Sequence, residues 1–280
     1  MTMASASGDI LERLMVTATR RALFSDVAAD STLDWGRDNA RDRVESNLKK
    51  LEDLQYRLYA DGSKSLLIIL QGIDASGKDG LIRNVFTAFN PQGTHVTSFK
   101  VPAGREMAQD YLWRVHEACP PRGSIGIFNR SHYEDLIVPI LNDGITSAQT
   151  AARIHHINNF ERMLADEGTT VVKFLLHISR DEQWDRFMSR LDEPNRNWKF
   201  RMGDLEERQR WDKYMRTFRK VVTSTSTDYA PWFVIPANAK WFRDFAVSEI
   251  VCSTLEGMNL RWPKPMIDVN LAKRELKRLR

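Results

Sequence analysis

The sequence predicts an α/β fold in which a central parallel sheet of five strands carries helices on both faces. Two observations lead to this prediction. Five short runs have the apolar or alternating composition of strands, and longer segments with apolar residues at helical spacing lie between them. Strands that alternate with helices form parallel sheets, because a helix returns the chain to begin the next strand in the same direction.

The five expected strands follow from their residue types. Residues 66–70 and 124–128 are short, mostly apolar runs, which is typical of strands buried on both faces. Residues 94–101 alternate and are rich in β-branched side chains. The apolar runs at 170–178 and 232–236 complete the sheet.

Helices are expected after these strands. The first follows the strand at 66–70, where helical spacing relates Leu81, Ile82, Val85, Phe86 and Phe89. Further helices are expected over 104–117, 147–167 and 240–255. Pro120-Pro121 closes the first of these three and Gly168 ends the second.

The 280 residues divide into three predicted parts: an N-terminal extension over 1–62, a core over 63–262 with a lid at about 180–214, and a tail over 263–280. Apolar spacing in the extension predicts helices over 11–24 and 43–59 that pack on the core. The tail is basic and helical in composition. We expect it to be solvated, or to bind a long polyanion or a partner chain.

Composition excludes several classes of protein. The two cysteines, Cys119 and Cys252, are far apart, which argues against a disulfide framework or a cysteine zinc site and indicates a reducing cytoplasm. No apolar run is long enough to span a membrane, and the first residues lack a secretory signal pattern. We therefore expect a cytoplasmic location and no membrane partner. The formal net charge of +4 favours a polyanionic ligand.

The segment Gly72-Ile73-Asp74-Ala75-Ser76-Gly77-Lys78 has the G-x-x-x-x-G-K pattern of a phosphate-binding loop. It lies between a predicted strand and a predicted helix, the context that this motif needs. The glycines permit close approach of the backbone to a ligand, and successive N–H groups at the start of the helix attract anions. An ordinary glycine-rich turn is the alternative.

Two acidic residues depart from the usual loop. Asp79 stands where a Ser or Thr would hold Mg²⁺. Asp74 lies inside the loop, where phosphate oxygens would repel a carboxylate unless a metal ion or a proton intervenes. We expect Asp74 to bind Mg²⁺, to activate an acceptor phosphate, or both. An outward-pointing Asp74 with no such role is the alternative.

A second group of polar residues follows the strand at 124–128. In open parallel sheets ligands gather at the carboxyl ends of the strands. Asn129 takes the place where nucleotide hydrolases carry a metal-binding Asp, and Arg130 follows it at once. Arg130 suits bidentate phosphate recognition, although a structural ion pair with Glu134 or Asp135 is the alternative. With no hydrolytic carboxylate in the standard position, transfer to an acceptor is favoured over hydrolysis.

A third group lies at 179–214, where the helical pattern breaks at 194–197. This segment interleaves the basic residues Arg186, Arg190, Arg196, Lys199, Arg201, Arg208 and Arg210 with the aromatic residues Trp184, Trp198, Phe200 and Trp211. The pattern is typical of a helix–loop–helix lid that closes cations over phosphates and excludes water. A basic hairpin on the surface is the alternative.

Taken together, the motifs resemble the polyphosphate kinase 2 family over about residues 63–260. The matching segments are GIDASGKDG at 72–80, FNRSHYED at 128–135, RLDEPNRNWKFRMGDLEERQRWDKY at 190–214 and DYAPWFVIPANAKWF at 228–242. The resemblance implies a P-loop kinase-like, three-layer α/β/α fold with a helical lid. It also implies reversible, Mg²⁺-dependent phosphoryl transfer between inorganic polyphosphate and nucleotides, from AMP to ADP and from ADP to ATP, in a homodimer or homotetramer.

Residue by residue, Asp74 and Lys78 match the loop acid and lysine of the family. Arg130 matches the arginine of its second motif, and Arg190 a lid arginine. These four are the expected catalytic residues. Asn129 stands where some members carry Asp, so the metal site is expected at Asp74, with Asn129 left open as a second ligand.

Further site residues are expected around these four. Phosphate or polyphosphate binding is expected of Gly72, Ala75, Ser76, Gly77, Asp79, Gly80, Arg83, Lys100, Arg105, Arg186, Lys199 and Arg208. Nucleotide contact is expected of Asn129, His132 and Glu134, although a structural role is favoured for His132. The motif that contains Glu134 resembles the branch of the family that accepts AMP as well as ADP. Branch members with Asn in place of Glu134 are associated with diphosphate acceptors. GMP and GDP are alternative acceptors, and Mn²⁺ is an alternative to Mg²⁺.

Two other functions are kept as alternatives. An ATP-dependent kinase for a nucleoside monophosphate or a small metabolite would share the loop and the lid but need no groove for a polymer. A non-catalytic nucleic-acid-binding P-loop protein is disfavoured by the mild charge and by the lack of a nucleic-acid-binding motif. We expect no specific nucleic-acid partner.

Overall fold

The computed structural model describes residues 3–17 and 27–280. Its centre is a parallel sheet with the strand order β2-β3-β1-β4-β5. The strands are β1 Ser65–Gln71, β2 Thr94–Ser98, β3 Ile125–Asn129, β4 Thr169–His177 and β5 Trp232–Pro236. The expected α/β fold with five parallel strands is confirmed, and each strand lies within three residues of its predicted bounds.

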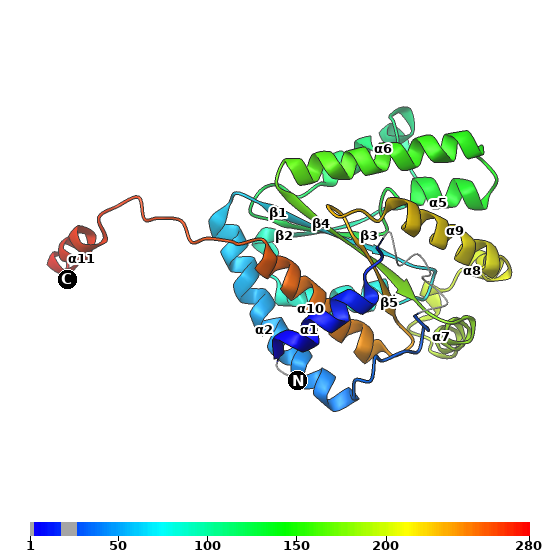
Figure 1. Ribbon diagram of the computed structural model, residues 1–280, viewed down its shortest axis with the longest axis horizontal. Coiled ribbons are helices and arrows are strands. Elements are labelled where there is room, and N and C mark those ends of the chain that lie inside the picture. Colours follow the sequence, from blue (N-terminus) through cyan, green and yellow to red (C-terminus); the bar gives the residue numbers. More distant parts are fainter. Residues whose placement is uncertain (1–2, 18–26) are drawn as a thin grey trace.

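Helices cover both faces of the sheet (Figure 1). The α-helices are α1 Met3–Leu14, α2 Arg37–Asp61, α3 Lys78–Val85, α4 Trp113–Ala118, α5 Glu134–Leu141, α6 Ser147–Asp166, α7 Arg180–Asp192, α8 Met202–Gln209, α9 Trp211–Thr225, α10 Lys240–Gly257 and α11 Val269–Arg278. The 3-10 helices are η1 Phe86–Ala88, η2 Pro91–Gly93, η3 Gly104–Ala108 and η4 Asn197–Lys199. In Figure 1, α1, α2 and α10 lie on one side of the sheet, and α5, α6 and α9 lie on the other.

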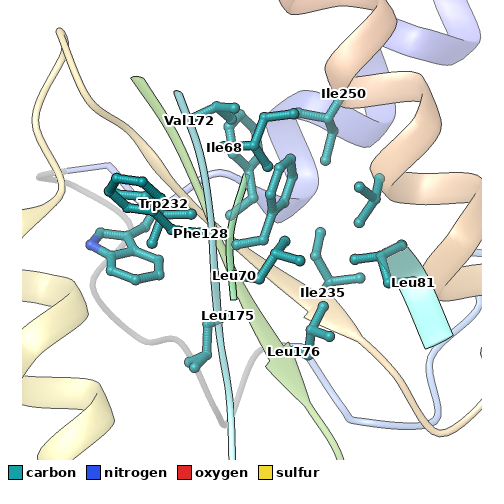
Figure 2. Packing of buried hydrophobic residues seen from close by; sticks show 14 of the residues in the cluster. Ile68, Leu70, Leu81, Phe128, Val172, Leu175, Leu176, Trp232, Ile235 and Ile250 are labelled. Atoms are coloured by element: carbon teal, nitrogen blue, oxygen red, sulfur yellow. The ribbon is translucent and has the colours of Figure 1, made fainter. Parts of the chain in front are cut away.

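The core joins the sheet to α10 and α3 (Figure 2). Ile68 of β1, Phe128 of β3 and Val172 of β4 are buried in this cluster, and Ile250 of α10 packs against them. Burying each such side chain stabilises the fold by about 1.5–3 kcal/mol. The central strands therefore form a rigid base from which the loops at their carboxyl ends project.

A charged pair lies buried on the other side of the sheet. Lys173 of β4 donates hydrogen bonds to Glu161 of α6, to the Tyr133 hydroxyl at 3.0 Å and to the Thr225 carbonyl at 2.7 Å. Lys173 and Glu161 are both fully buried. Since a buried charge is costly unless it is paired and hydrogen-bonded, these contacts fix how α6 lies against β4.

The N-terminal extension packs on the core through α2. Arg43 forms an ion pair with Glu249 of α10, and the Asn47 amide donates to Ser248 Oγ at 2.9 Å. The helix predicted over 11–24 is wrong in part, because α1 ends at Leu14 and Met15 bridges to Phe233 beside β5. The remainder of that prediction, residues 18–26, lies outside the described residues. The boundaries proposed at residues 62 and 262 stay predictions.

The helix predicted over 104–117 is also wrong. The chain forms the short η3 and then α4, which starts only at Trp113. The Asp110 carboxylate explains the break, because it accepts from the backbone N–H groups of Leu112 and Trp113 and so starts a new helix. Within the described ranges, no helix combines the length and the apolar composition that crossing a bilayer requires.

Candidate active site

The phosphate-binding loop connects β1 to α3 with a backbone that needs glycine. Gly77 has φ 102°, and a Cβ there would lie 2.3 Å from Arg243 Nη1. Gly72 has φ 153°, and a Cβ there would lie 2.8 Å from the Leu176 carbonyl oxygen. The loop is therefore pressed between β4 and α10, and its N–H groups lead into the N-terminus of α3, where an anion is favoured.

Lys78 is the first residue of α3 and is 8% exposed. Its ammonium group donates to the Gly72 carbonyl at 2.7 Å, across the loop. Burial lowers the pKa of Lys78, and the positive charge of Arg130 lowers it further. The Lys78 cation thus lies inside the loop, where a phosphate oxygen could replace the carbonyl as its partner.

Asp74 and Arg130 meet at the centre of the site. Arg130 Nη2 donates to Asp74 Oδ1 at 2.5 Å. Burial raises the pKa of Asp74, but the charges of Lys78, Arg130 and Arg190 outweigh this effect and hold the pKa below its usual value. Arg130 therefore pairs with the loop acid, and not with Glu134 or Asp135, the partners of its alternative structural role. Asp135 pairs with Arg114 instead, at 2.8 Å.

Arg130 reaches Asp74 because of an unusual backbone conformation. It directly follows β3 and has φ 62°, in the left-handed region that side chains other than glycine rarely adopt. Its N–H donates to the Leu70 carbonyl of β1 at 3.0 Å, which holds this conformation in place. Strained residues persist where the surrounding structure enforces them, and they cluster at functional sites.

Asn129 and Asp79 are direct partners. Asn129 Nδ2 donates to Asp79 Oδ1 at 2.7 Å. The two positions that depart from the usual metal-binding pair of phosphate-loop enzymes therefore contact each other across the site. Asp79 is exposed and lies in the first turn of α3, where its charge is favourable for the helix.

Glu134 begins α5 beside the loop. When the Gln71 amide is oriented to donate, its nitrogen lies 2.9 Å from Glu134 Oε1. Burial raises the pKa of Glu134 above its usual value, although the charges of Arg130 and Lys78 oppose this shift. Glu134 thus places a carboxyl group next to both cations of the site.

His132 does not reach the site. Its side chain is fully buried, and Nε2 lies 3.2 Å from Glu161 Oε1 in the cluster with Lys173. The ring also packs against Tyr133 and Phe160. These contacts agree with the favoured structural role of His132. No atom of its side chain is accessible, so we no longer expect it to contact a nucleotide.

The segment at about 180–214 consists of α7, η4 and α8, followed by the start of α9. The first turns of α7 hold the phosphate-binding loop in place. Gln183 Nε2 donates to the Asp74 carbonyl at 3.1 Å, and Arg186 Nη1 donates to the Ala75 and Ser76 carbonyls at 2.8 and 2.9 Å. Arg186 therefore supports the loop from behind through carbonyl groups.

Further along this segment, Arg190 lies 3.7 Å from Asp204 of α8. Asp204 and Glu207 are one helical turn apart, and both lie near Asp74. Burial and the negative charge of Asp74 raise the pKa of Asp204, and they raise the pKa of Glu207 to about 7. Sequence reasoning missed these two acids because the surrounding segment is dominated by basic residues, although their i, i+3 spacing could have indicated a shared face.

The other expected cations lie around this centre rather than in it. Arg208 donates to the Arg180 carbonyl at 2.6 Å and lies over Trp184, and Lys199 lies over Trp198. Arg105 lies over Trp113, and Arg83 and Lys100 are exposed. A Cβ at Gly80 would lie 3.6 Å from Arg243 of α10. Gly80 therefore faces α10 and not a ligand.

A cavity of about 520 Å³ opens beside the carboxyl end of β2. It is lined by Thr97, Ser98, Phe99, Lys100, Val101, Ala103, Glu106, Arg114, Glu117 and Ala118. Arg114 was not among the expected residues. It lies over the Phe99 ring and donates to the Lys100 carbonyl at 2.7 Å. A cavity of this size can hold a ligand of nucleotide dimensions.

No group of three or more acidic, histidine or cysteine side chains in the described ranges could hold a metal ion. The site offers the carboxylate of Asp74, and Asp204 and Glu207 lie near it without forming such a group. Mg²⁺ is commonly bound by one or two carboxylates together with substrate phosphates, so this donor set fits an ion that arrives with its substrate.

The arrangement suits transfer of a phosphoryl group between anions, because cations converge on a loop of phosphate-binding sequence with the acid Asp74 between them. Residues 35–263 match the family model described as "Polyphosphate kinase 2 (PPK2)". The chain belongs to the polyphosphate kinase 2 family. The resemblance of the four sequence motifs to this family is thereby confirmed.

Several members of the polyphosphate kinase 2 family are similar along most of their length. The AMP/ADP-polyphosphate phosphotransferase of Meiothermus ruber is 50% identical over 84% of this chain and 88% of its own. The ADP-polyphosphate phosphotransferase of Rhodopseudomonas palustris is 40% identical over 79% of this chain and 81% of its own. The crystal structure of polyphosphate kinase 2 from Arthrobacter aurescens TC1 matches with a TM-score of 0.92 at 38% identity, covering 97% of both chains.

Proposed function

We propose that this chain is a polyphosphate kinase that transfers phosphoryl groups reversibly between inorganic polyphosphate and nucleotides, from AMP to ADP and from ADP to ATP. The observation that carries the proposal is the convergence of Lys78, Arg130 and Asp74 at a phosphate loop, within a family whose members are named for this reaction. The alternatives of an ATP-dependent metabolite kinase and a nucleic-acid-binding protein find no support among these relatives.

Phosphoryl transfer between polyphosphate and a nucleotide requires mainly positioning of the reactants and neutralisation of their charge. In the forward direction, a terminal phosphate oxygen of the nucleotide attacks the last phosphorus of the polymer, and the bond from that phosphorus to its bridging oxygen breaks. Both reactants are anions, so cations must hold them in line. Lys78 and the N-terminus of α3 bind the phosphoryl group, and Arg130 offers two parallel N–H donors.

Asp74 has two roles in this proposal. It holds the Arg130 fork in place, and it provides a carboxylate that stays ionised because of its low pKa. Arg190, on the lid, adds a cation that comes with Asp204. The loop residues Gly72, Ala75, Ser76 and Gly77 would contribute N–H groups to the phosphates, while Asp79 holds Asn129.

Asp74 would hold Mg²⁺ together with substrate phosphates, with Mn²⁺ as a substitute. The ion would neutralise phosphate charge. A cation at Asp74 would also reduce the charge repulsion that, after burial, raises the pKa values of Asp204 and Glu207. The Asn129 side-chain oxygen remains a further candidate ligand, since its nitrogen makes the hydrogen bond to Asp79.

The polymer and the nucleotide need different surfaces. The exposed cations Arg83, Lys100 and Arg105, with Lys199 and Arg208 of the lid, would hold a polyphosphate chain without a fixed register. Such binding weakens with salt because it releases counterions. The cavity beside β2 would hold the nucleotide, with Arg114 as a cation in its wall.

Glu134 supports the branch that accepts AMP. Its carboxyl group lies near Lys78 and Arg130, so its negative charge disfavours an acceptor that brings an additional phosphate. AMP carries less charge than ADP and would be tolerated better. GMP and GDP remain alternative acceptors.

A homodimer or homotetramer and a cytoplasmic location are part of the same proposal. The resemblance to the family supports the homodimer or homotetramer. Cys119 and Cys252, which are both free, support the cytoplasmic location, since free thiols are typical of reducing compartments.

The test is an ATP assay with purified protein, Mg²⁺ and long-chain polyphosphate, with AMP in one reaction and ADP in another. The proposal expects ATP in both. ATP from ADP alone would contradict the assignment to the AMP-accepting branch. No ATP in either reaction, together with ATP consumption when AMP or another metabolite is added, would contradict the polyphosphate kinase activity itself.

A further inference from the structure

The C-terminal segment leaves the body of the molecule. After α10 ends at Gly257, the chain runs without regular structure to Asp268 and then forms α11, well away from the other helices (Figure 1). From Arg261 to Arg280, every residue except Ala272 is exposed. We call this segment the arm.

The arm ends in a helix with two distinct faces. One side of α11 and its flank carries the apolar residues Val269, Ala272, Leu276 and Leu279, whereas Leu271 lies beside Arg278. The opposite side carries Lys273, Arg274, Lys277 and Arg278. Leu276 is 70% exposed and Leu279 is 85% exposed. A ten-residue helix is marginal in water unless an apolar face of this kind is packed against something.

The base of the arm is fixed at one place. The Trp262 ring packs edge-on against Tyr56 of α2, with 5.6 Å between centroids, and Arg57 lies over the Trp262 ring. The Arg261 N–H donates to Asp61 Oδ2 at 2.6 Å. The arm therefore departs from the C-terminal end of α2.

This end of α2 is itself an exposed apolar and acidic surface. Tyr56 is 60% exposed and Tyr59 is 52% exposed, and the exposed acids Glu52 and Asp53 lie one turn before Tyr56 on the same face. Tyr59 lies against Gly93, where a Cβ would be 3.3 Å from its ring, and Val96, 52% exposed, follows three residues later on the edge strand β2. The exposed Lys49 lies on this face too, so its two acids leave one net negative charge beside the tyrosine rings, opposite in sign to the basic face of α11.

We propose that α11 docks on the Tyr56–Tyr59 surface of a second copy of this chain, in a reciprocal exchange of arms. The base of each arm and the surface that would receive the partner's arm adjoin each other on α2. In a two-fold dimer the same patch of both copies forms the contact, so this one end of α2 can serve both halves of the exchange. The proposal rests on the proposed homo-oligomeric state but not on the proposed catalytic activity.

Geometry and size support the exchange. Residues 263–268 can span roughly 20 Å when extended, which carries α11 beyond its own α2. A stable interface commonly uses about 20–30 residues from each partner, and the arm together with its receiving surface supplies that order of contact. Docking would bury the leucine side chains and leave the basic face beside Glu52 and Asp53.

Light scattering after size-exclusion chromatography tests the proposal with the full chain and its variant Leu276→Glu. The proposal expects an oligomer whose mass falls by half or more in the variant, down to one 32.4 kDa chain if the arms are the sole contact. Met163→Glu is the matched control, because Met163 is 40% exposed on α6 and outside the proposed interface. A mass that is the same for Leu276→Glu and for the wild type would overturn the arm exchange, and a monomeric wild type would overturn both it and the homo-oligomer.

Cross-linking identifies the receiving surface. A Leu276→Cys chain with one tag is mixed with a Tyr59→Cys chain with another tag and oxidised. A disulfide-linked pair carrying both tags is the expected product. Cys119 and Cys252 interfere little, because burial raises the pKa of each to about 12. If the Leu276→Cys/Tyr59→Cys double variant forms its disulfide only within one chain, the arm folds onto its own body and the proposal is wrong. The ATP assay of the same variants reports separately on catalysis.

Discussion

The Arg130 guanidinium donates to the Asp74 carboxylate at 2.5 Å, so a residue that follows β3 holds the acid of the loop that follows β1. The pair places one negative group between the cations Arg130 and Lys78. The site therefore carries its own counter-charge before any phosphate arrives, and substrate binding has to reorganise this pair.

Asp74→Asn should lower turnover by about 100-fold or more, because the amide can neither neutralise Arg130 nor bind a cation. Steady-state ATP production from ADP and polyphosphate measures the loss. Asp185→Asn on the exposed face of α7 is the matched control and should keep wild-type rates. Wild-type turnover in Asp74→Asn would remove this acid from the mechanism.

Arg130→Gly and Arg130→Ala should both lose transfer activity, yet differ in stability. The backbone at this position has φ 62°, which glycine adopts without strain and alanine does not. The free energy of unfolding of the glycine variant should therefore be about 1 kcal/mol higher than that of the alanine variant. Urea unfolding of the two proteins measures this difference, and equal stability would show that the left-handed backbone is not retained.

Glu207→Gln should change how stability depends on pH. The folded-state pKa of Glu207 is raised to about 7, so the folded chain binds this proton more tightly than the unfolded chain does. Relative to the variant, the wild type should lose stability as the pH rises from about 5 to about 8. Thermal unfolding of both proteins across this range provides the comparison. A difference that stays constant with pH would contradict the raised pKa.

Lys173→Met should destabilise the fold by about 3–5 kcal/mol, because it leaves the fully buried Glu161 without its cation. The double variant Lys173→Met/Glu161→Leu removes both charges and should recover much of this loss. Urea unfolding measures both. If the double variant is as unstable as the single one, packing rather than the unpaired charge is the cause.

Glu134→Asn should lower the ratio of the rates with AMP and with ADP, because it removes a negative charge beside Lys78 and Arg130. Glu134→Asp keeps the charge and should keep the preference for AMP. Initial rates with the two acceptors at equal concentration measure the ratio. An unaltered ratio in Glu134→Asn would reject this residue as the selector.

Local patterns were sufficient to predict the strands and the loop. The run at 66–70 is a strand because of its own apolar side chains, and the glycines at 72 and 77 provide the backbone freedom that the loop needs. The helix over 104–117 was wrong because the Asp110 side chain competes for backbone N–H groups, an effect that apolar spacing does not register.

Long-range pairings could not be predicted in the same way. Lys173 lies in an apolar strand, and only the folded structure brings it to Glu161 of α6 and Tyr133. Glu207 reaches Asp74 only because α8 folds back towards the loop, so its raised pKa has no signature in the sequence. Both pairings depend on which helix covers which strand, and the sequence of a single segment does not determine this.

The hydrogen bonds from Gln183 and Arg186 to the loop carbonyls make the first turns of α7 part of the wall of the site. Any swing of the lid must then bend the chain beyond Arg186, in the part that holds η4 and α8. The exposed cations at the loop side stay in place during such a swing. Such a swing would break the hydrogen bonds from Arg208 to the Arg180 carbonyl and to Gln183 Oε1, so these two bonds hold the outer half closed.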